Sequence, residues 1–223
     1  MKVIFAETRS KEKLSKKMIN EIAKAMPKKI AIFASIQYIE QAKQLENELK
    51  DKGKTIIKER SKDSLSAYPN QILGCDISSV EKIKNKIDAF LILGSRFHSL
   101  LTAIKTGKSV FFYSEGKLEK IAKEETERIK ARTKTALIKF YSSDKIGILV
   151  SLKPGQEKLA LAEKIKEKLK KLNKQGIIFL TDNINLNEFE NFPVEVYINT
   201  ACPTIIFDSN KIINFNDIVE LNK

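Results

Sequence analysis

Short apolar runs alternate with longer amphipathic segments along almost the whole chain. The runs at residues 29–33 and 89–93 are apolar at nearly every position, which is typical of strands buried on both faces of a parallel sheet. Between such runs, apolar residues recur at helical spacing, as Leu14, Met18 and Ile22 do. This alternation favours an α/β fold in which helices cover parallel sheets.

The same pattern predicts where each element lies. Ser35 is expected to cap a helix that carries Ile39 and Leu45 and stops at Gly53. The other predicted helices are residues 11–26, 80–87, 99–106, 118–141 and 156–173. The predicted strands are residues 1–6, 29–33, 55–57, 71–73, 89–93, 109–113, 146–151, 177–180 and 194–198, with a last one near 205–207.

These elements predict two small parallel-sheet domains, each built in three layers and joined by a long helix. Residues 11–116 form the central α/β domain in this interpretation, and residues 146–223 form the C-terminal one. The charged segment 117–145 is expected to be the connecting helix. A chain of 223 residues is long enough to bury a core in each domain.

Composition narrows the class of protein. Hydrophobic residues make up 42% and charged residues 31% of the chain, as in globular proteins. No apolar run has the length of a membrane span, and the first seven residues do not resemble a signal peptide. We therefore expect a cytoplasmic protein that is not associated with a membrane. In the cytoplasm thiols stay reduced, so we expect no structural disulfide.

The chain is strongly basic, with 41 Lys and Arg against 28 Asp and Glu and a formal net charge of +13. Such a charge suits either an anionic partner or simply well-solvated helices. The lysines are spread along nearly every predicted helix, and aromatic residues are not interleaved with them. We therefore expect no dedicated nucleic-acid binding.

Cys75 and Cys202 are the two cysteines of the chain, and each follows a short strand-like segment. Ligands of open α/β sheets bind at the carboxyl ends of strands, so both thiols are placed where chemistry usually occurs. They lie far apart in sequence, one in each predicted domain, which suits a metal centre assembled between domains. Two thiolates are, however, fewer than an iron–sulfur cluster normally has. The alternative is that each is a small buried hydrophobe.

Four loops follow predicted strands and carry the candidate chemistry. They are residues 74–76, 94–98, 153–156 and 200–203. Backbone amides in such loops hold carboxylates, phosphates or nucleotide groups. Each loop also has a structural interpretation, because a glycine can serve only a turn or a helix start and the sole histidine, His98, can be an interior residue. The candidate binding residues are Gly94, Ser95, Arg96, His98, Lys153, Gly155 and Gln156.

At these residues the chain resembles the diphthamide-synthesis enzymes, the 2-(3-amino-3-carboxypropyl)histidine synthases of archaea and eukaryotes. The resemblance rests on four segments in the same order: Leu-Gly-Cys-Asp at 73–76, a glycine loop ending in Phe-His at 94–98, Lys-x-Gly-Gln at 153–156, and Thr-Ala-Cys-Pro at 200–203. One tetrapeptide alone is weak support. Four in order across nearly the whole chain are fairly specific.

The resemblance implies a fold of three similar α/β domains, each giving one cysteine to a 4Fe–4S cluster that binds S-adenosylmethionine. Reduction would then produce a 3-amino-3-carboxypropyl radical, which adds to a histidine of translation elongation factor 2. Cys75 and Cys202 would be the second and third cluster ligands. The loops 94–98 and 153–156 would line the S-adenosylmethionine pocket, with Arg96 and Lys153 as partners for its carboxylate. His98 would lie behind the pocket or face the substrate.

The chain departs from this family pattern in two ways. The first domain and its cysteine are missing, and residues 1–10 look like the last strand of that domain. Residues 11–223 would therefore correspond to domains two and three of the family fold. In addition, Thr204 occupies the position where the family pattern has an arginine after Cys-Pro.

Three functions remain open from the sequence. The first is an enzyme subunit that needs a separate chain carrying the missing domain and the third cysteine, with a dimer as the expected assembly. The second is a non-catalytic accessory protein that supports cluster assembly or binds the elongation factor. The third is a small-molecule binder or a basic nucleic-acid module on a generic α/β fold, because the fold alone does not determine function.

Overall fold

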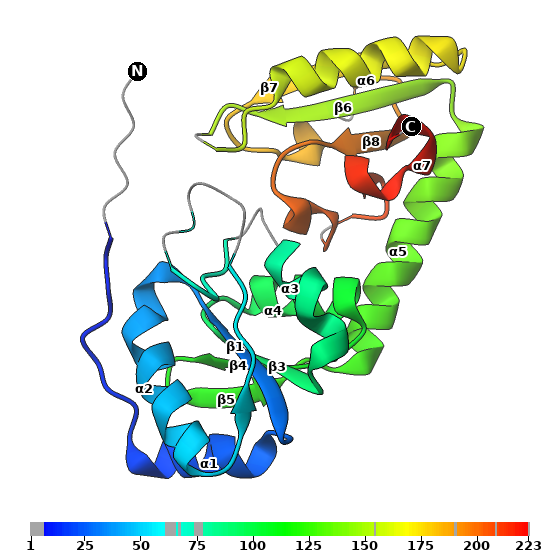
Figure 1. The fold of residues 1–223 in the computed structure, drawn as a ribbon. Coiled ribbons are helices and arrows are strands. Elements are labelled where there is room, and N and C mark those ends of the chain that lie inside the picture. Colours follow the sequence, from blue (N-terminus) through cyan, green and yellow to red (C-terminus); the bar gives the residue numbers. More distant parts are fainter. Residues whose placement is uncertain are drawn as a thin grey trace. The chain divides into compact units, whose positions relative to one another are not determined.

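The computed structural model describes residues 7–60, 66, 68–73, 78–153, 155–189, 191–207 and 209–222. The chain divides into two compact units, Met1–Thr126 and Glu127–Lys223 (Figure 1). The strand expected at residues 1–6 lies outside the described residues. Within the described part of the chain, no helix is long and apolar enough to cross a membrane.

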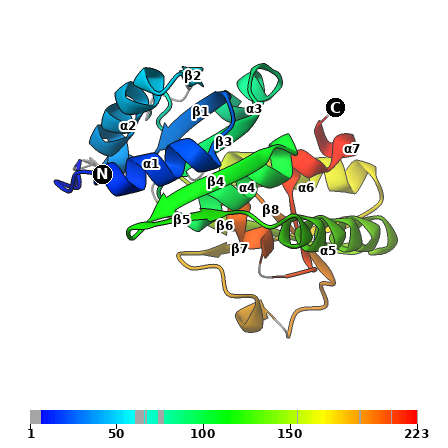
Figure 2. The ribbon, with the colours of Figure 1, turned by 90° about the horizontal axis from the view of Figure 1, so that it is seen from below.

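The first unit contains a five-stranded sheet in the order β2-β1-β3-β4-β5. All neighbouring strands are parallel except β4 and β5, which are antiparallel and lie side by side in Figure 2. Every residue of β3 is buried, as its apolar sequence predicts. The strands are β1 (Lys29–Ala34), β2 (Thr55–Ile56), β3 (Ala89–Leu93), β4 (Ser109–Ser114) and β5 (Lys117–Lys120).

Helices cover both faces of this sheet. Ile30 and Ile32 of β1 pack in one hydrophobic cluster with buried residues of α1 (Lys16–Ala25) and α2 (Ile39–Asp51). Because side chains alternate along a strand, Phe33 points to the opposite face. That face is covered by α3 (Ser78–Ile83), the short 3₁₀ turn η2 (Lys84–Lys86) and α4 (Arg96–Thr106).

The helix expected at residues 11–26 begins only at Lys16, so its predicted start is wrong. Ser15 is the N-cap, and its Oγ accepts a hydrogen bond of 3.2 Å from the backbone N of Met18. The residues before it are held by side chains of α2: Gln44 exchanges two hydrogen bonds with the backbone of Leu14. These tertiary hydrogen bonds take the place of the intrahelical hydrogen bonds that the apolar spacing predicted.

Two further details near β1 differ from expectation. Ser35 makes no side-chain cap; it precedes the 3₁₀ turn η1 (Ile36–Tyr38), and α2 starts after that turn. The strand expected at residues 71–73 is reduced to isolated bridges at Gln71 and Leu73, and Gln71 pairs with Ala34 in a parallel sense. The segment still lies against the end of β1, because the N of Ile72 donates to the carbonyl of Ala34 at 2.9 Å.

A long helix was predicted at residues 118–141, and the predicted start of this helix is wrong. Lys117–Lys120 form the edge strand β5, and the helix α5 runs from Lys123 to Ser142. A tight turn at Glu115 and Gly116, with φ values of 50° and 79°, reverses the chain into β5. The sequence predicted a helix here because this strand is charged, as exposed edge strands commonly are. Helix α5 continues across the boundary between the two units.

The second unit contains a four-stranded, fully parallel sheet in the order β7-β6-β8-β9. One hydrophobic cluster joins this sheet to helices α5, α6 and α7 (Figure 1). Among their described residues, the connections after β7 and β8 contain the 3₁₀ turns η3 (Leu186–Phe189) and η4 (Pro203–Phe207) and no longer helix. The remaining elements are β6 (Lys145–Ser151), α6 (Leu159–Lys171), β7 (Gln175–Thr181), β8 (Val196–Asn199), β9 (Ile212–Asn214), the 3₁₀ turn η5 (Phe215–Asp217) and α7 (Val219–Asn222).

The last strand was expected near residues 205–207, and this prediction is wrong. Those residues belong to η4, and the strand is β9, a few residues later. Both segments contain an Ile-Ile pair, so periodicity could not distinguish them. The first follows Pro203, which is suited to the start of a helical turn.

Candidate functional site

Gly94 directly follows β3 at the carboxyl edge of the first sheet, beside the end of β1. Its φ is +149°, and a Cβ placed there would lie 3.1 Å from Oγ of Ser35. The backbone N of Ser35 donates to the carbonyl of Leu93 at 3.0 Å, which holds the two strand ends together. The close approach and the positive φ both require glycine here.

Ser95 is the N-cap of α4, and its Oγ accepts a hydrogen bond of 3.1 Å from the N of Phe97. The helix therefore starts at Arg96, three residues earlier than the sequence indicated. Arg96 and His98 lie in its first turn rather than in a loop. The amides of a first helical turn lack intrahelical partners, so this junction offers donors to an anionic group.

Arg96 is held by Glu125 at the start of α5. Its two terminal nitrogens contact the two carboxylate oxygens at 2.6 and 2.7 Å, a bidentate pair. The hydrogen bonds with Glu125 raise the pKa of Arg96 above its ordinary value. The side chain of Glu125 is 15% exposed. The guanidinium thus has a partly buried partner of its own, and it could bind a ligand carboxylate only by sharing or leaving Glu125.

His98 lies largely buried on α4, and burial lowers its pKa below the usual value of 6.5. The ring is therefore neutral at pH 7. Its Nδ1 is buried and has no hydrogen-bond partner among the described residues. The same is true of Oγ1 of Thr102, one turn further along α4, and of Oγ of Ser79 on α3. Such atoms mark a place where water or another polar group fits.

Cys75 lies outside the described residues, together with Gly74 and Asp76. The chain leading to it is described as far as Leu73. Through the bridge at Gln71 this segment is attached to the end of β1, the strand that neighbours β3. The approach to Cys75 and the Gly94–His98 region therefore share the carboxyl edge of one sheet.

In the second unit, the loop after β6 is tied to the end of its own strand. Oγ of Ser151 accepts a hydrogen bond from the N of Lys153 at 3.2 Å, and the N of Gln156 donates to the carbonyl of Lys153 at 2.9 Å. Gly155 has a φ of +79° and open space around it, and Pro154 lies outside the described residues. The side chain of Lys153 is exposed and forms no ion pair within the described part of the chain.

The helix that was expected to start at Gln156 starts at Leu159 instead. The loop Lys153–Gln156 is thus separated from the helix N-terminus by a few residues. An interaction with an anion would use the Lys153 charge and the amide of Gly155, because the N atoms of Lys153 and Gln156 already donate within the loop. The helix would contribute less than the sequence suggested.

Cys202 lies in a loop that two buried asparagines fix in place. Asn199, the last residue of β8, donates to the carbonyl of Cys202 at 2.8 Å and accepts from the N of Ala201 at 3.0 Å. Asn214, the last residue of β9, donates to the carbonyl of Pro203 at 3.1 Å. Oγ1 of Thr200 donates to the carbonyl of Leu149 in β6 at 2.8 Å. The loop therefore has little freedom to move.

The thiol of Cys202 is free and partly exposed. Its Sγ lies 3.1 Å from Oγ1 of Thr204. A thiolate in this position is a suitable ligand for a soft metal or an iron–sulfur cluster. Among the described residues, no three His, Cys, Asp or Glu side chains are grouped closely enough to hold a metal ion. A site at Cys202 thus needs ligands from elsewhere.

Because β6 and β8 are neighbouring parallel strands, the structure places Cys202 and the Lys153–Gln156 loop at one sheet edge of the second unit. Gly94, Ser95, Arg96 and His98 are together in the first unit. The sequence interpretation missed the supporting residues Asn199, Asn214 and Glu125. For the two asparagines a signal existed, since each is a polar residue ending an otherwise apolar strand.

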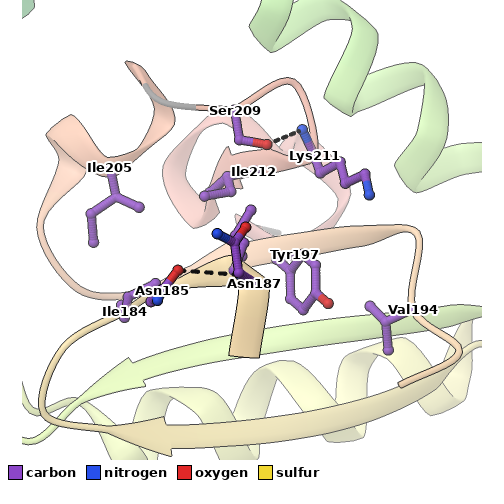
Figure 3. Close-up of a pocket in the computed structure, with 10 residues that line it drawn as sticks. Ile184, Asn185, Asn187, Val194, Tyr197, Ile205, Ser209, Lys211 and Ile212 are labelled. Carbon is purple, nitrogen blue, oxygen red and sulfur yellow. Dashed lines mark hydrogen bonds between the residues drawn. The ribbon is translucent and has the colours of Figure 1, made fainter. Parts of the chain in front are cut away.

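A pocket of about 560 Å³ lies elsewhere in the second unit, and the sequence did not predict it. Figure 3 shows that its polar residues contact one another: Oδ1 of Asn185 accepts from the N of Asn187, and Oγ of Ser209 accepts from the N of Lys211. Its remaining lining residues are Ile184, Leu186, Val194, Tyr197, Ile205 and Ile212. The wall thus combines polar and apolar groups, and Lys211 is the charged residue among the described ones that line it.

Comparison with known proteins identifies the family. The family model described as "Putative diphthamide synthesis protein" matches residues 1–216. The chain belongs to this family. The resemblance seen in the four sequence segments is thereby confirmed.

Two curated members of the family are similar over most of this chain. The 2-(3-amino-3-carboxypropyl)histidine synthase of Pyrococcus horikoshii is 32% identical over 194 residues, which are 86% of this chain and 55% of that protein. The protein of the same name from Methanocaldococcus jannaschii is 29% identical over 203 residues, 86% of this chain and 52% of that protein. The chain thus spans about half the length of the curated relatives it matches.

The fold is also similar to a solved structure of the family. The crystal structure of Dph2 from Pyrococcus horikoshii with 4Fe-4S cluster matches with a TM-score of 0.75 and 29% identity, covering 93% of this chain and 60% of that one. A second crystal structure of the same Dph2 matches equally well, with a TM-score of 0.75. The expected α/β fold with two mainly parallel sheets is confirmed.

Proposed function

We propose that this chain is part of a 2-(3-amino-3-carboxypropyl)histidine synthase. The complete enzyme would transfer the 3-amino-3-carboxypropyl group of S-adenosylmethionine to a histidine of translation elongation factor 2, the first step of diphthamide biosynthesis. Family membership supports the reaction class. The observation that carries the proposal for this chain is the free Cys202 thiol, held at a strand end by a buried asparagine pair.

In this proposal Cys75 and Cys202 are two of the three protein ligands of a 4Fe–4S cluster. The residues present have the chemical type that such a cluster requires, because thiolates are the usual cluster ligands and Cys202 is both free and accessible. When bound, the cluster would supply the electron for cleavage of a carbon–sulfur bond in S-adenosylmethionine. No cysteine of this chain remains for the third ligand.

The remaining candidate residues would bind S-adenosylmethionine. Lys153 is the best partner for its carboxylate, because its ammonium is exposed and has no ion-pair partner among the described residues. Arg96 would take part only after rearrangement of its pair with Glu125. Ser95 and Gly155 would contribute backbone donors, and neutral His98 would offer the unpaired Nδ1. Gln156 would act through its side-chain amide, and Gly94 would act by its lack of a side chain, because their backbone N atoms already donate to the carbonyls of Lys153 and Tyr113.

The proposed assembly includes a separate chain with the missing domain and the third cysteine. Its support is that the chain covers 55% of the Pyrococcus horikoshii synthase, a share that leaves room for one more domain of similar size. We further propose that the complex is a dimer and acts in the cytoplasm. The elongation factor would be its protein substrate, presenting a histidine ring as the acceptor.

The test is anaerobic affinity purification of this chain from its native cells, with iron content and co-purifying chains measured together. The purified assembly is then incubated with elongation factor 2 and S-adenosylmethionine labelled in its aminocarboxypropyl group. We expect iron, a partner with an essential cysteine, and labelled factor. Cys75→Ala and Cys202→Ala should each abolish transfer. Ser209→Ala should not, because Ser209 lines a pocket to which Cys202 does not contribute. An iron-free single chain would overturn the proposal.

A non-catalytic accessory role is the second candidate, and Thr204 favours it, because the family pattern has an arginine at this position. Such a protein would support cluster assembly in a catalytic partner or bind the elongation factor. The same cysteine variants distinguish the two functions. In the accessory role, Cys202→Ala would weaken assembly of the complex while leaving transfer measurable.

A further inference from the structure

In the described part of the chain, Thr204 is the residue whose side chain hydrogen-bonds to the thiol of Cys202. Its Oγ1 lies 3.1 Å from Sγ, and in the free protein either atom can be the donor. A hydroxyl is a good donor, whereas a thiol is a weak donor and a weak acceptor. Which atom donates therefore depends on whether the sulfur still carries its proton.

On the basis of the proposed function, we propose that Thr204 is a positioning residue whose hydroxyl donates to the Cys202 thiolate when that sulfur ligates a cluster. A cysteine that ligates metal has lost its proton. Thr204 is then the only member of the pair that can donate, so the direction of the hydrogen bond is determined. Hydrogen bonds to ligating sulfurs are among the factors that set the reduction potential of an iron–sulfur cluster.

The loop geometry keeps this hydroxyl beside the sulfur. The carbonyl of Cys202 accepts from Asn199 at 2.8 Å and from the N of Ile205 at 3.2 Å. The carbonyl of Pro203 accepts from Asn214 at 3.1 Å. The backbone is thus fixed on both sides of Thr204, in the first turn of η4. A short β-branched side chain on a fixed backbone has few rotamers to choose from.

The sign of the effect follows from charge. A donor to the thiolate withdraws negative charge from it and favours the more electron-rich, reduced cluster. Loss of the hydroxyl should therefore shift the midpoint potential to a more negative value. Thr204→Val removes the donor at nearly constant shape, and Thr204→Ser keeps the donor while removing a methyl group.

The experiment uses the complete iron-loaded assembly, purified anaerobically with its partner chain. The midpoint potential is measured by titration monitored with electron paramagnetic resonance, and exchangeable protons near the cluster are measured by electron–nuclear double resonance in H₂O and D₂O. We expect Thr204→Val to have a more negative potential and to lose one exchangeable proton coupling. Thr204→Ser should retain both wild-type properties. A valine variant with the wild-type potential and coupling would overturn the inference.

A measurement without iron tests the contact itself. The S–H stretching band of Cys202 in the reduced chain is assigned by its loss in Cys202→Ala. The frequency of this band should shift in Thr204→Val and stay at the wild-type value in Thr204→Ser. A band at the wild-type frequency in both variants would overturn the inference. Failure of the wild-type assembly to bind iron would instead overturn the proposed function and, with it, any role of Thr204 at a cluster.

Discussion

Asn199 and Asn214 occupy paired positions at the ends of two neighbouring parallel strands, and Nδ2 of Asn199 donates to Oδ1 of Asn214 at 2.7 Å. Both side chains are buried. Together they satisfy the carbonyls of Cys202 and Pro203 and the amide of Ala201. The strand register thus determines where the Cys202 loop lies, and the buried amides leave it few alternatives.

Replacing Asn199 with alanine should destabilise the protein and loosen the loop. The change leaves the amide of Ala201 and Oδ1 of Asn214 without this partner, which costs about 1–3 kcal/mol in the free energy of unfolding. It also removes one of the two hydrogen bonds to the carbonyl of Cys202. Urea denaturation of wild type and variant measures this cost. Asn210→Ala, at an exposed position close in sequence, should change stability by less than about 0.5 kcal/mol. Equal effects of the two variants would contradict the role assigned to Asn199.

Arg96 and Glu125 should show measurable energetic coupling. A double-mutant cycle with Arg96→Gln and Glu125→Gln is expected to give about 0.5–1 kcal/mol, the upper part of the range for surface pairs, because the contact is bidentate and Glu125 is mostly covered. The pair Glu127–Lys130 provides the control. Both of its side chains are exposed, at 56% and 44%, and they share a single contact of 3.0 Å, so the coupling should be about 0.3 kcal/mol or less. Equal coupling in the two cycles would show that the bidentate geometry adds nothing.

Gly147 in β6 should tolerate no larger residue. A Cβ there would lie 2.3 Å from Cδ1 of Tyr197, whose ring is buried. Gly147→Ala is therefore expected to cost about 3 kcal/mol, at the upper end for overpacking, because the ring has to move. Gly176→Ala is the comparison: its nearest contacts are 3.1–3.2 Å to ends of flexible side chains. That variant should cost about 1 kcal/mol, and the reverse order in thermal unfolding would contradict the packing argument.

The buried parallel strands could be predicted from the sequence because their residues face apolar surroundings on both sides. β3 matches its predicted bounds, Ala89–Leu93, without any shift. Elements whose stability comes from tertiary contacts could not be predicted in this way. The edge strand β5 has an exposed, charged sequence, and the start of α1 depends on glutamines of α2.

For the candidate site, the sequence allowed prediction of which loops follow strand ends, but not of which residues form hydrogen bonds with them. A glycine or cysteine after an apolar run marks a strand end, so Gly94 and Cys202 were found. The hydrogen bonds that surround them join residues distant in sequence, such as Arg96 with Glu125 and Asn199 with Asn214. No local pattern contains this information, since it depends on strand order and register.

His98 should make the stability of the protein depend on pH in a narrow window. Burial lowers its pKa in the folded protein, whereas the unfolded chain titrates near 6.5. Between these two values the unfolded state binds more protons, so the free energy of unfolding rises with pH there. Stability is thus fully present above about pH 6.5 and is lost as the pH falls towards the pKa of the folded state.

The window is well isolated, because His98 is the only histidine in the chain and Asp and Glu titrate mainly below it. Urea unfolding at intervals between pH 7.5 and about 5 measures the slope. In His98→Gln, which keeps a polar side chain but does not titrate, the slope should be flatter than in wild type. The change Lys164→Gln, at an exposed position of α6, is the control for altered charge and should leave the slope unchanged. A His98→Gln variant with the wild-type slope would show that the ring takes up its proton equally well in the folded and unfolded states.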